Sequence, residues 1–292
     1  MFFGPHVNRS QLIGHNNDII QHIEDAREYS HNESGMDISA VAIFVGGPRT
    51  RKITLLADER VALKSYIERS NIQVIAHSSY SAQPWRGDPD AARYICEELN
   101  VCQESGIIGL VVHLPKLPIA NIMKYISRLL VLSAPDVKIY LETPAVNPKE
   151  SYYETPKKLT KLFKEIRKID PNLERFGLCI DTAHLWTSGV DISTLENAEN
   201  WIKELEANSD IIPHNNVMIH LNDSERPLGV GPDKHAGLAM GKIWSSYKSA
   251  PAKSGIAAFI DYALRHQLIT ILERKPQEAL KSDYLILRKL IF

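Results

Sequence analysis

The chain contains little cysteine, no surplus of charge of either sign and no long apolar run. Three of its 292 residues are cysteine (Cys96, Cys102 and Cys179), and no pair has the CxxC spacing, so a disulfide framework is not expected and a reducing compartment fits. Lysine and arginine number 34 and aspartate and glutamate 35, for a formal net charge of −1. A polyanionic partner would therefore have to be bound by local charge or by a bound metal.

Signals for export or membrane insertion are also missing. The segment Met1–His6 lacks the basic start and the long apolar stretch of a signal peptide. The longest apolar runs, such as Ile107–Val112, are far shorter than a membrane span. We therefore predict an intracellular protein, cytoplasmic or nuclear, that contacts no membrane and for which a monomer is the simplest assembly. If the source is a virus, packaging in the virion stays open.

Eight short segments with strand character alternate with longer amphipathic segments. Several of the short segments are almost continuously apolar, as buried parallel strands are. The predicted strands are residues 2–7, 40–45, 73–77, 107–113, 138–142, 176–181, 217–221 and 269–273. The predicted helices are residues 16–29, 57–70, 90–103, 119–132, 156–168, 193–207, 256–265 and 277–289.

This alternation predicts an α/β protein with the (β/α)8 TIM barrel fold, formed by residues 1–292 as one domain. Successive strands lie roughly 30–40 residues apart, which is the length that a βαβ unit needs. A doubly wound open sheet is the alternative, but no Gly-rich dinucleotide turn follows the first strand. Residues 222–244 form the longest stretch without a regular pattern, and a long loop of this kind is usually functional.

Histidines and carboxylates stand where the predicted strands end. The active site of a TIM barrel lies at the C-terminal ends of its strands, so these side chains are expected to converge. Asp233 and His235, in the long loop, are spaced so that both side chains lie on one side of an extended segment. The candidate ligands are His77, His113, Glu142, Asp181, His184, His220, Asp233, His235 and Glu273.

Each of these residues also has a structural explanation when it is taken alone. A strand-end histidine is usually a hydrogen-bonded structural residue, and Asp181 with His184 would also serve to cap a helix. Four carboxylates buried together, however, are strongly unfavourable without cations, and histidine with carboxylate suits zinc or manganese. Nine such ligands suit two or three ions, and paired ions activate water for phosphodiester hydrolysis.

Three segments of the chain carry motifs of a known family. They are Gly177-Leu-Cys-Ile-Asp-Thr-Ala-His184, His220-Leu-Asn-Asp-Ser224 and Leu141-Glu-Thr143. On these segments the chain resembles endonuclease IV, the zinc-dependent apurinic/apyrimidinic (AP) endonuclease, and the resemblance extends from Gly4 to Glu273. The detailed sequence, including Thr182-Ala-His-Leu-Trp186 and Ile271-Leu-Glu-Arg274, most resembles the versions carried by large DNA viruses.

The resemblance implies a centre of three zinc ions, with manganese as an alternative at one position. One zinc would be held by His77, His113 and Glu142, a second by Glu142 as a bridge with Asp181, His220 and Glu273, and a third by His184, Asp233 and His235. It implies Glu273 and Glu142 as catalytic residues, with Glu273 orienting or deprotonating the attacking water. The implied reaction cleaves double-stranded DNA on the 5′ side of an abasic site, leaving a 3′-hydroxyl and a 5′-deoxyribose phosphate, and the same site trims blocked 3′ ends.

The resemblance also implies DNA contacts from two loops. Arg49 and Tyr80 match the side chains that the family inserts into the duplex, whereas Ser81 replaces the family's neighbouring apolar insertion residue. Trp85 is a candidate to supply the missing stacking surface or, alternatively, an aromatic residue that covers the core. The basic stretches 49–52 and 157–168 are candidates for contact with the DNA backbone, although a solvated helix face explains the second better.

The sequence departs from the family at two further places. Ala239-Met240-Gly241 stands where the family has Gly-Glu-Gly, and Arg274 stands where the family has threonine. Neither departure removes a ligand, and Arg274 is expected to pair with a nearby acid rather than to approach a phosphate. His6 is expected either to support the ligands from behind or only to form a hydrogen bond at its strand end.

Two other functions fit parts of the same pattern. Sugar isomerases and epimerases share this barrel but usually hold one or two metals, so the additional His184, Asp233 and His235 favour a nuclease. A DNA-binding or virion protein without activity would be expected to have lost ligands, whereas all nine are present.

Overall fold

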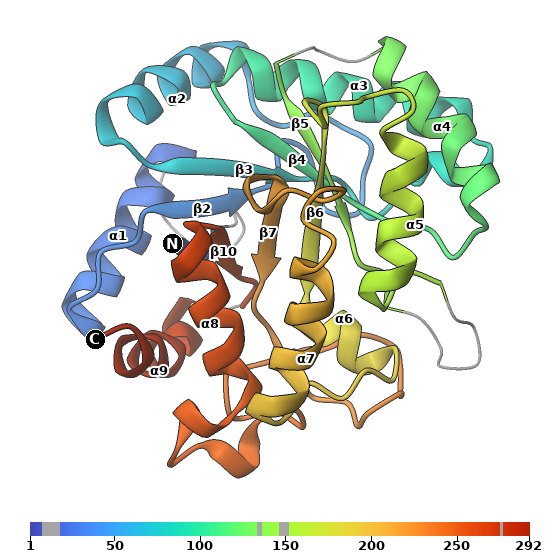
Figure 1. The fold of residues 1–292 in the computed structure, drawn as a ribbon. Coiled ribbons are helices and arrows are strands. Elements are labelled where there is room, and N and C mark those ends of the chain that lie inside the picture. The colour runs from blue at the N-terminus through green and yellow to red at the C-terminus, as the bar shows by residue number, and fades with distance from the viewer. Residues whose placement is uncertain (8–17, 133–135, 146–151, 275–276) are drawn as a thin grey trace.

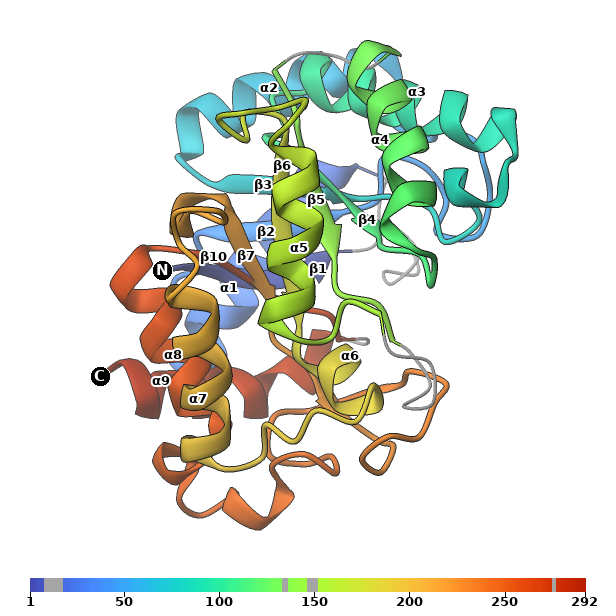
Figure 2. The ribbon, with the colours of Figure 1, turned by 45° about the vertical axis from the view of Figure 1, so that its right-hand side comes forward.

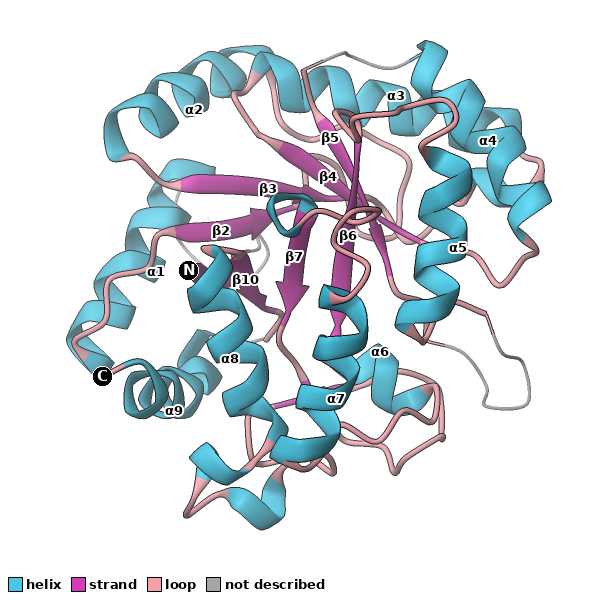
Figure 3. Ribbon diagram, viewed as in Figure 1, coloured by secondary structure: helices cyan, strands magenta, loops and turns pink. Residues whose placement is uncertain are grey.

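Eight parallel strands close into a barrel that helices surround (Figure 1, Figure 3). The computed structural model describes residues 1–7, 18–132, 136–145, 152–274 and 277–292. Strands follow one another around the barrel in sequence order, and the last pairs with the first, which confirms the predicted TIM barrel. The barrel strands are β1 (Phe2–Val7), β2 (Ala40–Ile43), β3 (Gln73–His77), β4 (Gly109–His113), β5 (Lys138–Glu142), β6 (Phe176–Asp181), β7 (Val217–His220) and β10 (Ile269–Leu272).

The outer helices begin and end at residues with the expected capping chemistry. Asp18 and Asp88 accept hydrogen bonds from the backbone N–H two residues further on, both at 2.9 Å, and so cap α1 and α3. Helix α1 extends beyond residue 29, its predicted end, and stops at Gly35, whose φ of 67° ends it. Residues 16 and 17, which were predicted to begin this helix, lie outside the described residues. The helices are α1 (Ile19–Ser34), α2 (Ala57–Ser70), α3 (Pro89–Glu104), α4 (Ile119–Leu132), α5 (Pro156–Ile166), α7 (Leu195–Glu206), α8 (Gly255–His266) and α9 (Lys281–Ile291).

Short elements complete the described chain. A helix that the sequence pattern did not predict, α6 (Thr182–Thr187), follows β6 directly, with Asp181 as its cap. The remaining elements are β8 (Asp223–Ser224), β9 (His235–Ala236) and the 3-10 turns η2 (Pro84–Arg86), η3 (His214–Asn216), η4 (Ser245–Tyr247), η5 (Pro251–Lys253) and η6 (Gln277–Leu280).

The core has two layers, because the strands are buried on both faces. One layer lies between the strands and the helices, and a smaller one fills the barrel. The ring of Tyr140 fills the barrel beside two glycines, since a Cβ on Gly109 or Gly177 would lie 2.6 or 2.7 Å from that ring. The almost continuous apolar strands of the sequence are explained by this double burial.

The long segment after β7 lies at the end of the barrel towards which β7 points. It contains the antiparallel pair of β8 and β9, and Figure 2 shows it in orange, close to α6. The buried carboxylate of Asp223 accepts hydrogen bonds from the N–H groups of Gly241, at 3.1 Å, and Ile243, at 2.9 Å, so the segment is tied to itself. Among the residues that the structure describes, no helix combines the length and the apolar character needed to cross a membrane.

Candidate metal centre

Parallel pairing brings the ends of the strands together at one end of the barrel, which we call the barrel mouth. The register pairs His113 with Glu142 and Asp181 with His220, so side chains that end neighbouring strands lie side by side. Glu273 follows β10 directly. Each of the nine predicted ligands lies in this region.

The first group joins the ends of β3, β4 and β5. Glu142 Oε2 lies 2.7 Å from His113 Nε2 and 3.5 Å from His77 Nε2. Glu142 is fully buried, and His113 is the most exposed of the three, with 39% of its side chain open to solvent. The ligand atoms of these three residues lie within 4.8 Å of one another, which is close enough to bind one ion.

The second group shares Glu142 with the first. His220 Nδ1 lies 2.8 Å from Glu142 Oε1, 3.3 Å from Glu273 Oε2 and 4.0 Å from Asp181 Oδ2. These four residues also have ligand atoms within 4.8 Å of one another. The two carboxylate oxygens of Glu142 therefore face different groups, as a bridging ligand requires.

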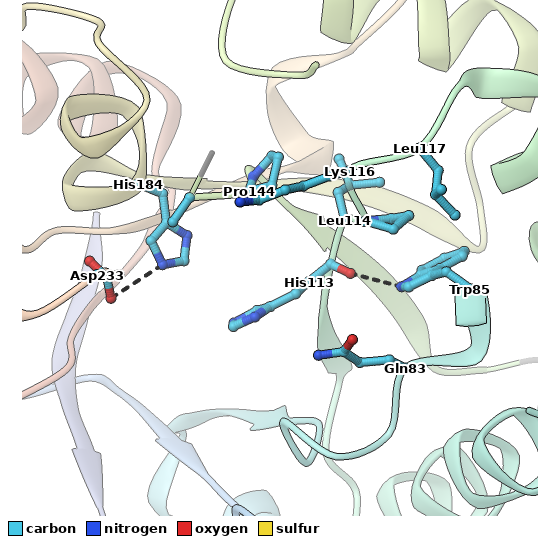
Figure 4. A pocket seen from close by; sticks show the side chains of 11 residues that line it. Gln83, Trp85, His113, Leu114, Lys116, Leu117, Pro144, His184 and Asp233 are labelled. Atoms are coloured by element: carbon cyan, nitrogen blue, oxygen red, sulfur yellow. Dashed lines mark hydrogen bonds and ion pairs between the residues drawn. The ribbon is translucent and has the colours of Figure 1, made fainter. Parts of the chain in front are cut away.

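The third group joins α6 to the long segment after β7. Asp233 Oδ2 lies 2.9 Å from His235 Nε2 and 3.5 Å from His184 Nε2, and Figure 4 shows the latter pair. His235 Nε2 also lies 3.7 Å from Asp181 Oδ2. Asp181 also acts as the predicted helix cap, because its Oδ1 accepts a hydrogen bond from His184 N at 2.8 Å at the start of α6.

Two of the histidine rings, those of His77 and His184, are oriented as metal ligands are. Nδ1 of His77 lies 2.8 Å from the carbonyl oxygen of Ser78, and Nδ1 of His184 lies 2.7 Å from that of Thr143. A carbonyl oxygen only accepts, so Nδ1 carries the hydrogen, and in the neutral ring Nε2 presents a lone pair. That lone pair faces a carboxylate oxygen in each case, an arrangement that needs a proton or a metal ion between the two acceptors.

The electrostatics of the centre fit a cation. Burial lowers the pKa of His184 and His235, but the neighbouring aspartates outweigh burial and raise the pKa of both, that of His235 to about 9. Burial raises the pKa of Glu142, but the histidines beside it outweigh burial and hold the pKa well below its usual range. Asp233 Oδ1 is buried without a hydrogen-bond partner in the described part of the chain. Metal ions would replace the histidine protons and satisfy such oxygens.

Residues with neutral side chains hold the ligands in place, and residue type alone did not identify them. Asn222 Nδ2 donates to Asp181 Oδ2 at 2.8 Å and to Glu273 Oε2 at 3.1 Å. Thr143 Oγ1 accepts from Asp181 N at 3.0 Å. Both residues lie inside the motifs Leu141–Thr143 and His220–Ser224, which was the available signal.

The predicted DNA-contacting residues lie around the rim of the centre. Arg49 is exposed, and Tyr80 is 44% exposed with its ring packed on His77 and His113. The Ser81 hydroxyl lies 2.8 Å from Ser79 Oγ.

Trp85 differs from the other rim residues. It is buried, and its indole N–H donates to the carbonyl oxygen of His113 at 3.0 Å (Figure 4). Of its two predicted functions, covering the core therefore fits the structure and an exposed stacking surface does not. With His113 and His184, it lines a cavity of about 550 Å³ beside the centre.

The departures from the family are accommodated locally. Ala239 adopts φ 56°, a left-handed conformation in which glycine is favoured. Arg274 Nε lies 3.9 Å from Asp283 Oδ2, so the predicted pairing with an acid is confirmed. His6 Nδ1 lies 3.5 Å from Glu273 Oε1, which places it behind a predicted ligand.

Known proteins resemble this chain in both sequence and fold. The model of the xylose isomerase-like TIM barrel family matches residues 33–274. A protein of African swine fever virus (isolate Warthog/Namibia/Wart80/1980) named "Probable AP endonuclease" is 37% identical over 268 residues, 88% of each chain. "Probable endonuclease 4" of Nitrosopumilus maritimus (strain SCM1) is 29% identical over 87% of this chain and 90% of its own. The solved structure described as "AsfvAP:AG" is 34% identical and superposes with a TM-score of 0.92, covering 100% of this chain and 99% of that one. The chain therefore belongs to the endonuclease IV group of the xylose isomerase-like TIM barrel family.

Proposed function

We propose that this chain is an AP endonuclease that hydrolyses the phosphodiester 5′ to an abasic site in double-stranded DNA. The products would be a 3′-hydroxyl and a 5′-deoxyribose phosphate, and the same centre would trim blocked 3′ ends. The observation that carries the proposal is the convergence of five histidines and four carboxylates in overlapping groups at the barrel mouth. The names of the viral and archaeal relatives support the choice of DNA as substrate.

Three zinc ions, with manganese as an alternative at one position, fit the three groups. His77, His113 and Glu142 would hold one ion, and Glu142 with Asp181, His220 and Glu273 a second; His184, Asp233 and His235 would hold the third. Support comes from the separations between ligand atoms, within 4.8 Å in the first two groups and 2.9 and 3.5 Å from Asp233 to the two histidines of the third. The ring orientations of His77 and His184 also support it. Bound zinc would supply positive charge for the phosphate oxygens and would acidify the attacking water.

Among the carboxylates of the second group, Glu273 is the one best situated to orient the attacking water. Its side chain is 9% exposed, whereas those of Glu142 and Asp181 are fully buried. Burial raises the pKa of Glu273, but the neighbouring His220 outweighs burial and holds that pKa well below its usual range. An ionised carboxylate of low pKa accepts a hydrogen bond readily and keeps a proton poorly, so orientation is its principal contribution.

Tyr80 and Arg49 are the proposed contacts to the DNA duplex. Tyr80 N donates to the carbonyl oxygen of Pro48 at 2.9 Å, so the loops that carry the two side chains are coupled. An abasic sugar is neither paired nor stacked, so little energy is needed to expose it to the centre.

Cleavage of a duplex with one tetrahydrofuran abasic analogue tests the proposal. The zinc-loaded chain should cut 5′ to the analogue, and excess chelator should abolish cutting. Glu273→Gln should lose cutting while it largely keeps binding, and normal cutting by this variant would show that the assignment of Glu273 is wrong. About one metal per chain with activity on a ketose would favour the sugar-isomerase alternative, and duplex binding without cutting would favour a non-enzymatic DNA-binding protein.

A further inference from the structure

The turn Pro227–Val230, between β8 and β9, exposes two aliphatic side chains to solvent. Leu228 is 41% exposed and Val230 is 45% exposed. Val230 N donates to the carbonyl oxygen of Pro227 at 3.1 Å, and Gly229 has φ 70°, so the four residues form a tight turn. The two side chains therefore project from a compact support.

This turn is fastened to the helix that carries a candidate ligand. Gly229 N donates to the carbonyl oxygen of Trp186 at 3.0 Å, and the Trp186 indole N–H donates to the carbonyl oxygen of Arg226 at 2.9 Å. Trp186 is itself buried in α6, two residues after His184. The aliphatic side chains are thus held near the centre in a fixed orientation, and a partner that covers them need not order the loop first.

Val230 lines a cavity that reaches a residue of the candidate metal centre. With Lys116, Thr187 and Asp233 it lines a cavity of about 550 Å³. Lys116 and Asp233 also line the cavity shown in Figure 4, which contains His113 and His184. The turn follows β7, and in the barrel order three strands separate β7 from β3 on either side. The turn therefore lies across the barrel mouth from the loop of Tyr80.

We propose that Leu228 and Val230 form an apolar contact with the base stack of the DNA duplex at the abasic site, on the side opposite Tyr80. The inference rests on the proposed function, because a missing base leaves the faces of its neighbours without a stacking partner. Nucleobase faces bind apolar side chains without regard to sequence. Two aliphatic side chains are far too few for a stable protein interface, which buries about 800 Å² on each partner.

The departure at position 81 supports the same contact. Ser81 is polar, and its hydroxyl lies within hydrogen-bond distance of Ser79 Oγ, so the loop after β3 offers the ring of Tyr80 with no aliphatic neighbour at that position. An aliphatic pair on the opposite rim would supply the apolar contact that Ser81 cannot make.

The test compares binding of a tetrahydrofuran duplex with binding of the undamaged duplex, in the Glu273→Gln background. Replacing both Leu228 and Val230 by serine should weaken binding of the damaged duplex about tenfold, the effect expected from re-exposing two half-covered aliphatic side chains. Binding of the undamaged duplex should change less than about twofold. Leu285→Ser, at a 39% exposed position in α9, is the matched control and should affect neither DNA.

A 2-aminopurine base beside the analogue gives an independent signal, since its fluorescence rises when the base is unstacked. The double variant should show a smaller rise than the parent at saturation. Equal losses on both duplexes, or unchanged preference and unchanged fluorescence, would overturn the inference. If the protein with Glu273 intact cuts the damaged duplex and only this binding preference fails to change, the proposed function stands and the inference alone is wrong. If the Glu273→Gln parent does not prefer damaged DNA and the protein with Glu273 intact does not cut it, both are wrong.

Discussion

Replacement of Asn222 by alanine should weaken the metal centre without removing a ligand. The side chain is 1% exposed, and its Nδ2 donates to Asp181 Oδ2 at 2.8 Å and to Glu273 Oε2 at 3.1 Å. Its Oδ1 accepts from Glu273 N at 3.0 Å. One amide therefore fixes two candidate ligands, Asp181 at the end of β6 and Glu273 just after β10, the strands on either side of β7.

The size of the effect follows from these three hydrogen bonds. Two have an ionised acceptor and contribute about 1.5–3 kcal/mol each, and the third contributes about 1 kcal/mol. Their sum, roughly 4–7 kcal/mol, is an upper limit, because water fills part of the space and the bonds share one side chain. We expect a loss of about 3 kcal/mol in the free energy of unfolding, and a loss of about 10–100-fold in zinc affinity or cleavage rate.

Urea denaturation of the zinc-loaded protein measures the first loss, and zinc titration with a cleavage assay measures the second. Asn172→Ala is the matched control, because its exposed side chain makes one hydrogen bond, of 3.3 Å, to Glu174; it should stay within about 0.5 kcal/mol of the parent. The argument for Asn222 is refuted if the free energy of unfolding of Asn222→Ala stays within the same margin of the parent and the variant binds zinc and cuts DNA as the parent does.

The other predictions concern the protonation of His235 and Asp283 and the hydrogen bonds that the buried Glu98 accepts. Zinc binding at pH 7 should release protons, because neighbouring aspartates outweigh burial and raise the pKa of His235 to about 9; calorimetry in buffers of different ionisation enthalpy counts them, and a count of zero contradicts the assignment. Burial raises the pKa of Asp283 from 3.8 to about 7, so its contribution to stability is complete below about pH 4 and is lost as the pH rises through 7. Asp283→Asn should remove about 2.6 kcal/mol of pH dependence between pH 5 and pH 8 in urea melts, and an unchanged difference in the free energy of unfolding between these two pH values would refute it. Glu98→Leu should lower the free energy of unfolding by about 3 kcal/mol and raise KM for DNA, because Ser78 Oγ and Ser79 N lose their acceptor in the loop of Tyr80. Glu98→Gln, which keeps an acceptor, should give effects between those of the parent and those of Glu98→Leu. Equal effects of the two variants would refute this role.

Apolar patterning predicted the barrel but not the ends of its strands. All eight predicted strands are present, and four are shorter by one or two residues. Ile107 is buried, yet its N–H donates to the carbonyl oxygen of Cys102 and so closes the end of α3 rather than joining β4. Val45 is equally buried, but its carbonyl oxygen accepts from Thr54 N and Leu55 N within a loop. Hydrophobicity indicates burial, whereas the hydrogen-bond partner decides between strand and loop.

The candidate centre was predictable because a TIM barrel places successive strand ends side by side. Strand ends identified His77, His113 and Glu142 without knowledge of any distance. Asn222 and Thr143 were not identified, since a neutral side chain signals no ligand and their partners come from other strands. The helix α6 was missed because six residues are too short for a periodic pattern to appear, although its cap residue was noted.

Charge connects the proposed metal content to the proposed substrate. The chain has a formal net charge of −1, so its overall charge gives no attraction to DNA. The four carboxylates of the centre contribute −4, and three divalent ions, as proposed, would contribute +6, which leaves about +2 at the barrel mouth before hydroxide binds. The metal would thus supply the attraction to phosphate as well as the chemistry. A chelator should therefore weaken binding of the damaged duplex as well as abolish cutting, whereas a DNA-binding protein that relied on surface lysines would keep its affinity.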